Sequence, residues 1–242
     1  MSDRAGPVTL VTGSARGLGL AVARELAAAG DRVHVVWRSS ADRAEALERE
    51  FPGRVHRVDL ASDAEASDLV QAVLGSDGRL DRVVHAVGDF DAGPLDQVEP
   101  STLRALFESN VMSAWNLACA GREAVRASGG AWVFFGCAGL GGQRARRQTA
   151  AYAAAKSALA VLVRSMALEE AAHGVRVNMV SPGIVPHDGA HPDTLDPARQ
   201  ARIPMGRTGN PQEIAKAAAW LLSDDSGYAT GQDLEIAGGW ML

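Results

Sequence analysis

A glycine-rich turn near the N-terminus joins a β-branched run to a helix-like segment. The run at residues 8–11 leads into TGSARGLG, residues 12–19, and the helix-like stretch LAVARELAAAG follows at once. In this setting Gly13 permits a tight turn, Gly17 lets the backbone approach a pyrophosphate, and Gly19 allows close packing of helix on strand. The helix N-terminus then offers its N–H groups to an anion. The turn by itself also fits an ordinary βα connection or the nucleotide-type ligand of a methyltransferase.

Strand-like and helix-like segments alternate along the whole chain. Short β-branched runs occupy residues 8–11, 32–37, 54–58, 82–86, 131–136, 175–181 and 234–236, and helix-like stretches begin near residues 17, 41, 63, 101, 150 and 211. This alternation is typical of βαβ units that feed a parallel sheet. We therefore expect an α/β protein with a Rossmann-type doubly wound sheet of about seven parallel strands, helices on both faces, and one domain over residues 1–242. Residues 182–204, rich in Pro, Gly, His and Asp, are expected to form a long, functional loop.

Composition and charge argue against several classes of protein. Hydrophobic residues make up 47% of the chain and charged residues 22%, which is ordinary for a globular protein. The formal net charge is −5 without a block of Lys and Arg, so we expect no nucleic-acid partner. The N-terminus lacks a secretory pattern, and no apolar run approaches the roughly 18 residues of a membrane span. We expect a cytoplasmic protein without membrane or metal partners, in which Cys119 and Cys137 are unpaired thiols.

Further motifs follow the glycine-rich turn in order along the chain. Asp59-Leu60 follows the third expected strand, HAVG (residues 85–88) follows the fourth, and Asn110 lies in the next helix-like stretch. Tyr152 and Lys156 begin another helix, and SPG (residues 181–183) ends the sixth strand. This set resembles the short-chain dehydrogenase/reductase family along nearly the whole chain, in particular the 3-oxoacyl carrier-protein reductases, with a faint similarity to pteridine reductases after the second strand.

The resemblance implies an oxidoreductase that binds a nicotinamide cofactor. It assigns adenine contacts to Asp59-Leu60, likens HAVG to the family's Asn-Asn-Ala-Gly segment, and places residues 181–185 beside the nicotinamide. The residues expected at the cofactor are Gly13, Ser14, Arg16, Gly17, Leu18, Gly19, Arg38, Ser39, Asp59, Leu60, Ala86, Val87, Gly88, Tyr152, Lys156, Pro182, Gly183 and Val185.

The end of the second expected strand predicts a preference for NADPH (the cofactor NADP). Enzymes that select NAD commonly place an acid here to bond the ribose hydroxyls, but this strand ends in WRSS and no carboxylate occurs before Asp42. Arg38 offers a planar guanidinium and Ser39 a hydroxyl, which suit a 2′-phosphate. Arg16 stands where relatives that prefer NADPH also tend to carry a base. A solvated charge at the strand end is the simpler alternative for each arginine.

Tyr152 and Lys156 are expected to act together. Four residues apart in a helix, their side chains share one face. The resemblance makes Tyr152 the general acid that protonates the developing alkoxide, and Lys156 the residue that holds the nicotinamide ribose and lowers the pKa of the phenol. It also implies that Asn110 stabilises a local helix distortion and positions a water that passes protons to Lys156.

The third catalytic position departs from the family pattern. Relatives carry a serine after the fifth strand that hydrogen-bonds the substrate carbonyl, whereas here Cys137 takes that place, and the interval to Tyr152 is two residues longer. A thiol is a weaker donor than a hydroxyl, so Cys137 either polarises the carbonyl less strongly or is a small packing residue. Arg144, Arg146 and Arg147 in the longer interval fit either a site for an anionic substrate group or a solvated charge run.

We therefore expect an NADPH-dependent carbonyl reductase for a small-molecule or acyl-type carbonyl. A non-catalytic NADPH-binding or sensor protein that has lost the serine is the alternative, and the retention of Tyr152, Lys156 and Asn110 argues against it. A methyltransferase would leave Tyr152 and Lys156 without a role. The helix expected around residues 150–172 is apolar on nearly every side, which indicates cover by a partner subunit, and the resemblance implies a homodimer or homotetramer. The motifs leave the substrate and the direction of reaction open.

Overall fold

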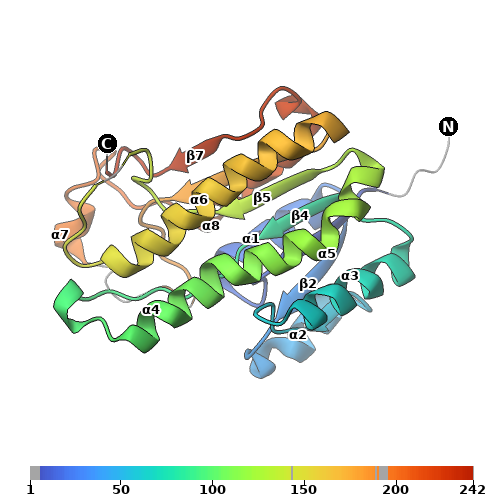
Figure 1. The fold of residues 1–242 in the computed structure, drawn as a ribbon, viewed down its shortest axis with the longest axis horizontal. Coiled ribbons are helices and arrows are strands. Elements are labelled where there is room, and N and C mark those ends of the chain that lie inside the picture. Colours follow the sequence, from blue (N-terminus) through green and yellow to red (C-terminus); the bar gives the residue numbers. More distant parts are fainter. Residues whose placement is uncertain (1–5, 143, 189, 191–195, 242) are drawn as a thin grey trace.

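Seven parallel strands form one sheet in the order β3-β2-β1-β4-β5-β6-β7 (Figure 1). The computed structural model describes residues 6–142, 144–188, 190 and 196–241. The strands are β1 Val8–Thr12, β2 Arg32–Trp37, β3 Val55–Arg57, β4 Arg82–His85, β5 Ala131–Phe135, β6 Arg176–Pro182 and β7 Asp233–Ile236. The predicted fold class is confirmed, and the first and last residues of each predicted strand agree with the observed ones to about one residue.

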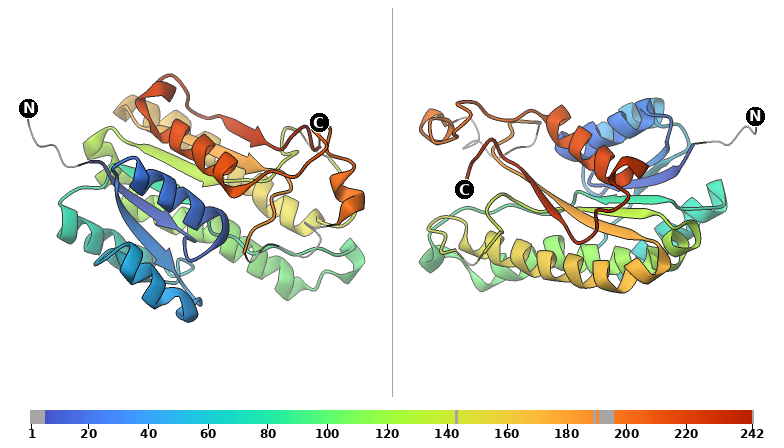
Figure 2. Two further views of the ribbon diagram at one scale, coloured as in Figure 1. Left: turned by 180° about the vertical axis from the view of Figure 1, so that it is seen from behind. Right: turned by 90° about the horizontal axis from the view of Figure 1, so that it is seen from above.

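Helices cover both faces of this sheet. They are α1 Gly17–Ala28, α2 Ala44–Glu50, α3 Asp63–Asp77, α4 Pro100–Phe107, α5 Ser113–Ser128, α6 Ala150–Glu170, α7 Pro197–Gln200 and α8 Pro211–Leu222. One apolar core unites α3, α5 and α6 with one face, and a second unites α1, α2 and α8 with the other (Figure 2). Because both faces are covered, all five residues of β1 and of β5 are buried, as expected for central parallel strands.

The carboxyl ends of β1 and β4 lie side by side where the strand order reverses. β1 pairs with β2 on one side and with β4 on the other, so the connections that leave β1 and β4 run to opposite halves of the sheet. Open α/β sheets bind their ligands in the crevice at such a switch point. The glycine-rich turn follows β1, and the HAVG segment follows β4, so the fold brings these two motifs to one place.

Two segments differ from the prediction. The helix expected from residue 101 is divided into α4, a π-helical turn at Glu108–Met112, and α5. The short helix α7 lies within the segment predicted as a loop, residues 182–204, of which residues 189 and 191–195 lie outside the described part of the chain.

One helix passes a test of length and composition for a membrane span, although Lys156 and Arg164 interrupt its apolar sequence. Among the described residues, Ala150–His173 passes that test by length and composition, with a mean hydropathy of 1.3 over its most apolar window. This segment is α6 with a following 3₁₀ turn, and it packs against the sheet at the centre of one core. Core helices of globular proteins have the same composition, so the test carries little weight for this helix.

Candidate active site

The turn between β1 and α1 needs glycine at several positions. Gly13 and Gly17 have positive φ angles of 70° and 62°. A Cβ atom on Gly13 would lie 2.6 Å from the carbonyl oxygen of Ala86, and one on Gly19 would lie 2.3 Å from that of Gly13. The expected close packing of α1 on the end of β1 at Gly19 is therefore confirmed.

Ser14 stabilises the turn from within. Its buried hydroxyl donates to the carbonyl of Val11 (2.7 Å) and accepts from the backbone N–H of Val36 (2.8 Å), so this predicted cofactor residue has its side chain engaged with β1 and β2. Arg16 is exposed, caps α1 in an extended conformation and gives it no side-chain hydrogen bond. The first N–H groups of α1 therefore lack a side-chain cap from Arg16, which suits a site for a pyrophosphate.

The segment after β6 lies on this turn. A Cβ atom on Gly17 would lie 2.7 Å from Nδ1 of His187. Arg43, in the 3₁₀ turn before α2, donates to Asp188 over 2.6 Å. The space that Gly17 leaves free for a ligand is thus occupied here by the side chain of His187 and the carbonyl of Asp188. These two residues join the segment after β6 to the edge of the site.

The end of β2 carries a half-exposed cluster of charges. Nη1 of Arg38 lies 3.8 Å from a carboxylate oxygen of Asp59, so two predicted cofactor residues pair with each other. Ser39 is exposed beside them, and Leu60 is buried. Asn116 of α5, which sequence reasoning missed, donates to the carbonyl of Leu60 and holds the segment after β3 in place.

α6 brings Tyr152 and Lys156 together beside the carboxyl end of β5. Lys156 is buried, and its Nζ donates to the carbonyl of Phe135 over 2.8 Å. The same Nζ lies 5.9 Å from the centroid of the Tyr152 ring. Tyr152 is half-buried, and the ring of Phe90 packs edge-on against it with the centroids 4.9 Å apart. The structure therefore places these two side chains on one face of α6, as the spacing predicted.

The pKa values of this pair are governed by burial. Burial raises the pKa of Tyr152 above its usual range, Cys137 acts in the same direction, and the guanidinium of Arg146 opposes them. The net shift of the Tyr152 pKa is thus upward, opposite to the lowering expected from Lys156, whose Nζ bonds the β5 backbone here. Burial lowers the pKa of Lys156 to about 8, opposed by Cys137.

Cys137 lies two residues beyond β5 and close to Tyr152. Its half-buried side chain packs against the core, and burial raises the pKa of its thiol, opposed by the charges of Arg146 and Lys156. The thiol is therefore neutral near pH 7, which leaves it a weak hydrogen-bond donor. Both Cys137 and the exposed Cys119 are unpaired, as predicted.

Asn110 occupies the π-helical turn, so the distortion that the resemblance implied is present. Its fully buried amide donates to the carbonyls of Asp89 (3.0 Å) and Leu106 (2.9 Å). Its Oδ1 is buried without a hydrogen-bond partner in the protein. A Cβ atom on Gly88 would lie 2.1 Å from this Oδ1 and 3.1 Å from Nζ of Lys156. Gly88 therefore keeps a small space between the amide and the lysine, which fits an additional polar ligand such as water.

The predicted residues after β6 serve the framework. Gly183 donates its N–H to the carbonyl of Ile236, and a Cβ atom there would lie 2.7 Å from Cα of Ala237. Val185, expected beside the nicotinamide, has its side chain 4% exposed and packed in the core that contains α8. Pro182 ends β6. Any contact of these residues with a ligand is thus left mainly to the backbone.

Sequence reasoning missed two buried polar residues, His85 and Ser113, at the base of the site. The ring nitrogens of His85 lie 3.0 Å from Oγ1 of Thr12 and 3.1 Å from Oγ of Ser113. The available signal was the histidine that stands first in HAVG, where the family segment has asparagine.

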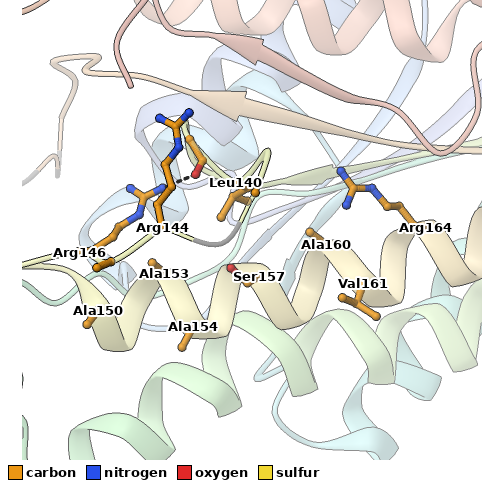
Figure 3. A pocket seen from close by; sticks show the side chains of 13 residues that line it. Leu140, Arg144, Arg146, Ala150, Ala153, Ala154, Ser157, Ala160, Val161 and Arg164 are labelled. Atoms are coloured by element: carbon orange, nitrogen blue, oxygen red, sulfur yellow. Dashed lines mark hydrogen bonds between the residues drawn. The ribbon is translucent and has the colours of Figure 1, made fainter. Parts of the chain in front are cut away.

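A groove of about 550 Å³ lies between residues 139–142 and 144–146 on one side and the outer side of α6 on the other (Figure 3). Arg144 and Arg146 approach it from the loop and Arg164 from the helix, while most of its remaining wall is small and apolar. Arg146 donates to the carbonyls of Ala138 and Gly139, and Arg144 to that of Met241. Two of the three predicted arginines thus hold the loop in place, and Arg147 is exposed.

Comparison with protein families agrees with this geometry. The family model described as enoyl-(acyl carrier protein) reductase matches residues 13–241. The chain is 31% identical to the 3-oxoacyl-[acyl-carrier-protein] reductase of Escherichia coli, with 97% of each chain covered. It is 32% identical to the L-fucose dehydrogenase of Bos taurus, covering 97% of this chain and 89% of that one, and 32% identical to the D-erythrulose reductase of Gallus gallus, covering 96% and 95%.

Solved structures show the same fold. A short-chain type dehydrogenase/reductase from Mycobacterium ulcerans superposes with a TM-score of 0.89 at 30% identity, covering 97% of this chain and 90% of the other. A dehydrogenase/reductase from Sinorhizobium meliloti gives a TM-score of 0.88 at 28% identity, covering 97% and 95%.

Proposed function

The chain belongs to the short-chain dehydrogenase/reductase family of oxidoreductases, and we propose that it is an NADPH-dependent reductase of a small-molecule or acyl-type ketone. The observation that carries the proposal is the meeting of Tyr152, Lys156 and Asn110 beside the glycine-rich turn at the switch point of the sheet. The reductases of acyl-carrier-bound and sugar-like ketones among its relatives support a carbonyl substrate.

The proposed cofactor fits the residues present. The glycine-rich turn and the first N–H groups of α1 would hold the pyrophosphate in the place that His187 now takes against Gly17. Arg38 with Ser39 would bind the 2′-phosphate at the exposed end of β2. The guanidinium of Arg38 lies 3.8 Å from the carboxylate of Asp59, and both side chains are about half exposed. An ion pair of this kind contributes little free energy, so a phosphate can displace Asp59 easily. Bound NADPH supplies the hydride.

Tyr152 would donate its hydroxyl proton to the carbonyl oxygen as charge develops there. The phenol is protonated near pH 7, which is the form that a proton donor requires. Lys156, with a pKa near 8, is mostly charged at this pH and stabilises the developing anion electrostatically. Asn110 offers its unpartnered Oδ1 toward Lys156, and a water held between them would return a proton to the site.

The proposal extends to the assembly of the protein in the cytoplasm. Large apolar side chains are exposed on two neighbouring helices, Met112 and Trp115 before and in α5, and Val161 and Leu168 in α6. Leu168 is 82% exposed, which is costly for a monomer and favours a homodimer or homotetramer that covers this face.

A screen of ketones that follows NADPH oxidation at 340 nm tests the proposed function. Tyr152→Phe should lower turnover by about 10²–10⁴-fold, because the ring still packs but the donated proton is lost. Its NADPH affinity should stay within a few-fold of the wild type. Tyr228→Phe, which alters the other, fully exposed tyrosine, is the matched control and should leave the rate unchanged. NADPH binding with no turnover on any ketone would favour the sensor protein instead.

A further inference from the structure

His85 is a buried titratable side chain that the proposed proton transfer does not use. It ends β4 in register with Thr12 of β1, has no exposed surface, and lies with its ring 6.0 Å from that of Phe134. Both of its ring nitrogens have partners, Oγ1 of Thr12 at Nδ1 and Oγ of Ser113 at Nε2. Thr12 precedes the glycine-rich turn, and Ser113 follows the π-helical turn, so the ring touches two functional segments.

Ser113 fixes the direction of these hydrogen bonds. Its hydroxyl donates to the carbonyl of Ser109 over 2.6 Å, so its oxygen accepts from Nε2–H of His85. A neutral ring that carries its proton on Nε2 then accepts at Nδ1 from the hydroxyl of Thr12. Burial and the charge of Lys156 lower the pKa of His85 to about 3, so the neutral ring persists across the working pH range.

The Ser113 residue that His85 holds is bonded to the π-helical turn by its backbone and by its side chain. The backbone N–H of Ser113 donates to the carbonyl of Glu108, and its side chain donates to the carbonyl of Ser109. The hydroxyl of Ser109 in turn accepts from the N–H of Asp89 (3.1 Å) and from the amide of Asn110 (3.2 Å). Through Ser113 and Ser109, the ring of His85 thus connects to the side chain of Asn110.

We propose that His85 is a positioning residue that stabilises the π-helical turn and thereby keeps Asn110 beside Lys156. Its second nitrogen ties the same turn through Thr12 to the start of the cofactor site. The inference rests on the proposed function, because it assumes that Asn110 assists proton transfer. Small displacements of positioned groups are costly, since a shift of about 1 Å far from the chemistry can reduce a rate about 10²-fold.

A matched pair of substitutions separates the two hydrogen bonds. In His85→Gln the side-chain amide reaches about as far from the backbone as Nε2 of the histidine does, so it should keep the hydrogen bond to Ser113. The kcat of this variant should stay within about threefold of the wild type. The shorter His85→Asn retains only the Thr12 contact, and its kcat should fall roughly tenfold or more, with the KM for NADPH within a few-fold. Equal kcat values in the two variants would overturn the proposal.

A double-mutant cycle tests whether His85 acts through Ser113. Ser113→Ala, which also removes the bond to the carbonyl of Ser109, should lower kcat at least as much as His85→Asn does, and the double variant should be no worse than Ser113→Ala, because the bond between His85 and Ser113 is already lost in each single variant. A double variant whose kcat falls by the product of the two single reductions would contradict the proposal. His34→Phe is the control: this buried histidine bonds Asp77 and His56 in a separate cluster, so its loss should lower stability and leave kcat unchanged.

Amide hydrogen exchange in the full chain provides a readout that does not require turnover. Residues 108–113 should exchange faster in His85→Asn and Ser113→Ala than in the wild type and in His85→Gln. Unchanged exchange in this segment would overturn the positioning role. If the wild type reduces no ketone, the proposed function fails, whereas the exchange pattern still decides whether His85 stabilises the turn.

Discussion

The neutral, fully buried ring of His85 makes the stability of the fold depend on pH. The pKa of this side chain is lowered from about 6.5 to about 3, first by burial and then by the charge of Lys156. The unfolded chain therefore binds a proton at pH values where the folded protein does not. Stability from this group is complete above pH ~6.5 and is lost as the pH falls toward ~3.

The size of the loss follows from the two pKa values. At pH ~5 the unfolded state gains about 2 kcal/mol from protonation of His85, and at pH ~7.5 it gains almost nothing. In His85→Gln this term is absent, so the free energy of unfolding should fall by about 2 kcal/mol less between these two pH values than in the wild type. Aspartate and glutamate contribute little in this range, since their unfolded pKa values are ~4.

Urea unfolding at both pH values and one protein concentration measures the difference, because concentration alters the apparent stability of an oligomer. His173→Asn, which changes an exposed histidine after α6, should keep the pH dependence of the wild type. Equal losses of stability in the wild type and in His85→Gln would refute the reasoning, and would mean that the ring is protonated in the folded protein or reaches solvent.

Three further outcomes are expected. The wild type should bind NADPH at least about tenfold more tightly than NADH, and Arg38→Asp should reverse the preference; fluorescence titration of both cofactors measures this, and equal wild-type affinities would exclude the assignment. Cys137→Ser should keep or raise kcat because a hydroxyl is the stronger donor, whereas Cys137→Ala should lower it without altering NADPH binding; parental rates in both would make Cys137 a packing residue. Glu170→Ala should reduce the free energy of unfolding, because Arg126 and Arg122 then lose the buried carboxylate that they share, while Arg126 keeps its pair with the exposed Glu123; an unchanged free energy in urea unfolding would show that the buried carboxylate contributes little.

The fold class and the position of each motif within it were predictable from the order of residues along the chain. The strands were predictable because β-branched runs and glycine-rich turns are local signals, and the strand bounds agree with them closely. The spacing of Tyr152 and Lys156 also sufficed to place both side chains on one face of α6, because residues four apart in any α-helix lie on the same face.

The electrostatics of the site and the hydrogen-bond partners of its polar side chains depend on the folded arrangement and were not predictable. The pKa of Tyr152 was expected to be lowered and is raised, chiefly because the fold buries the phenol. Lys156, which was expected to lower it, bonds the carbonyl of Phe135 in β5, 21 residues away. The linkage from Thr12 through His85 to Ser113 joins residues 73 and 28 positions apart. Desolvation and hydrogen-bond partners arise from side chains that distant segments bring together, and no local pattern in the sequence records them.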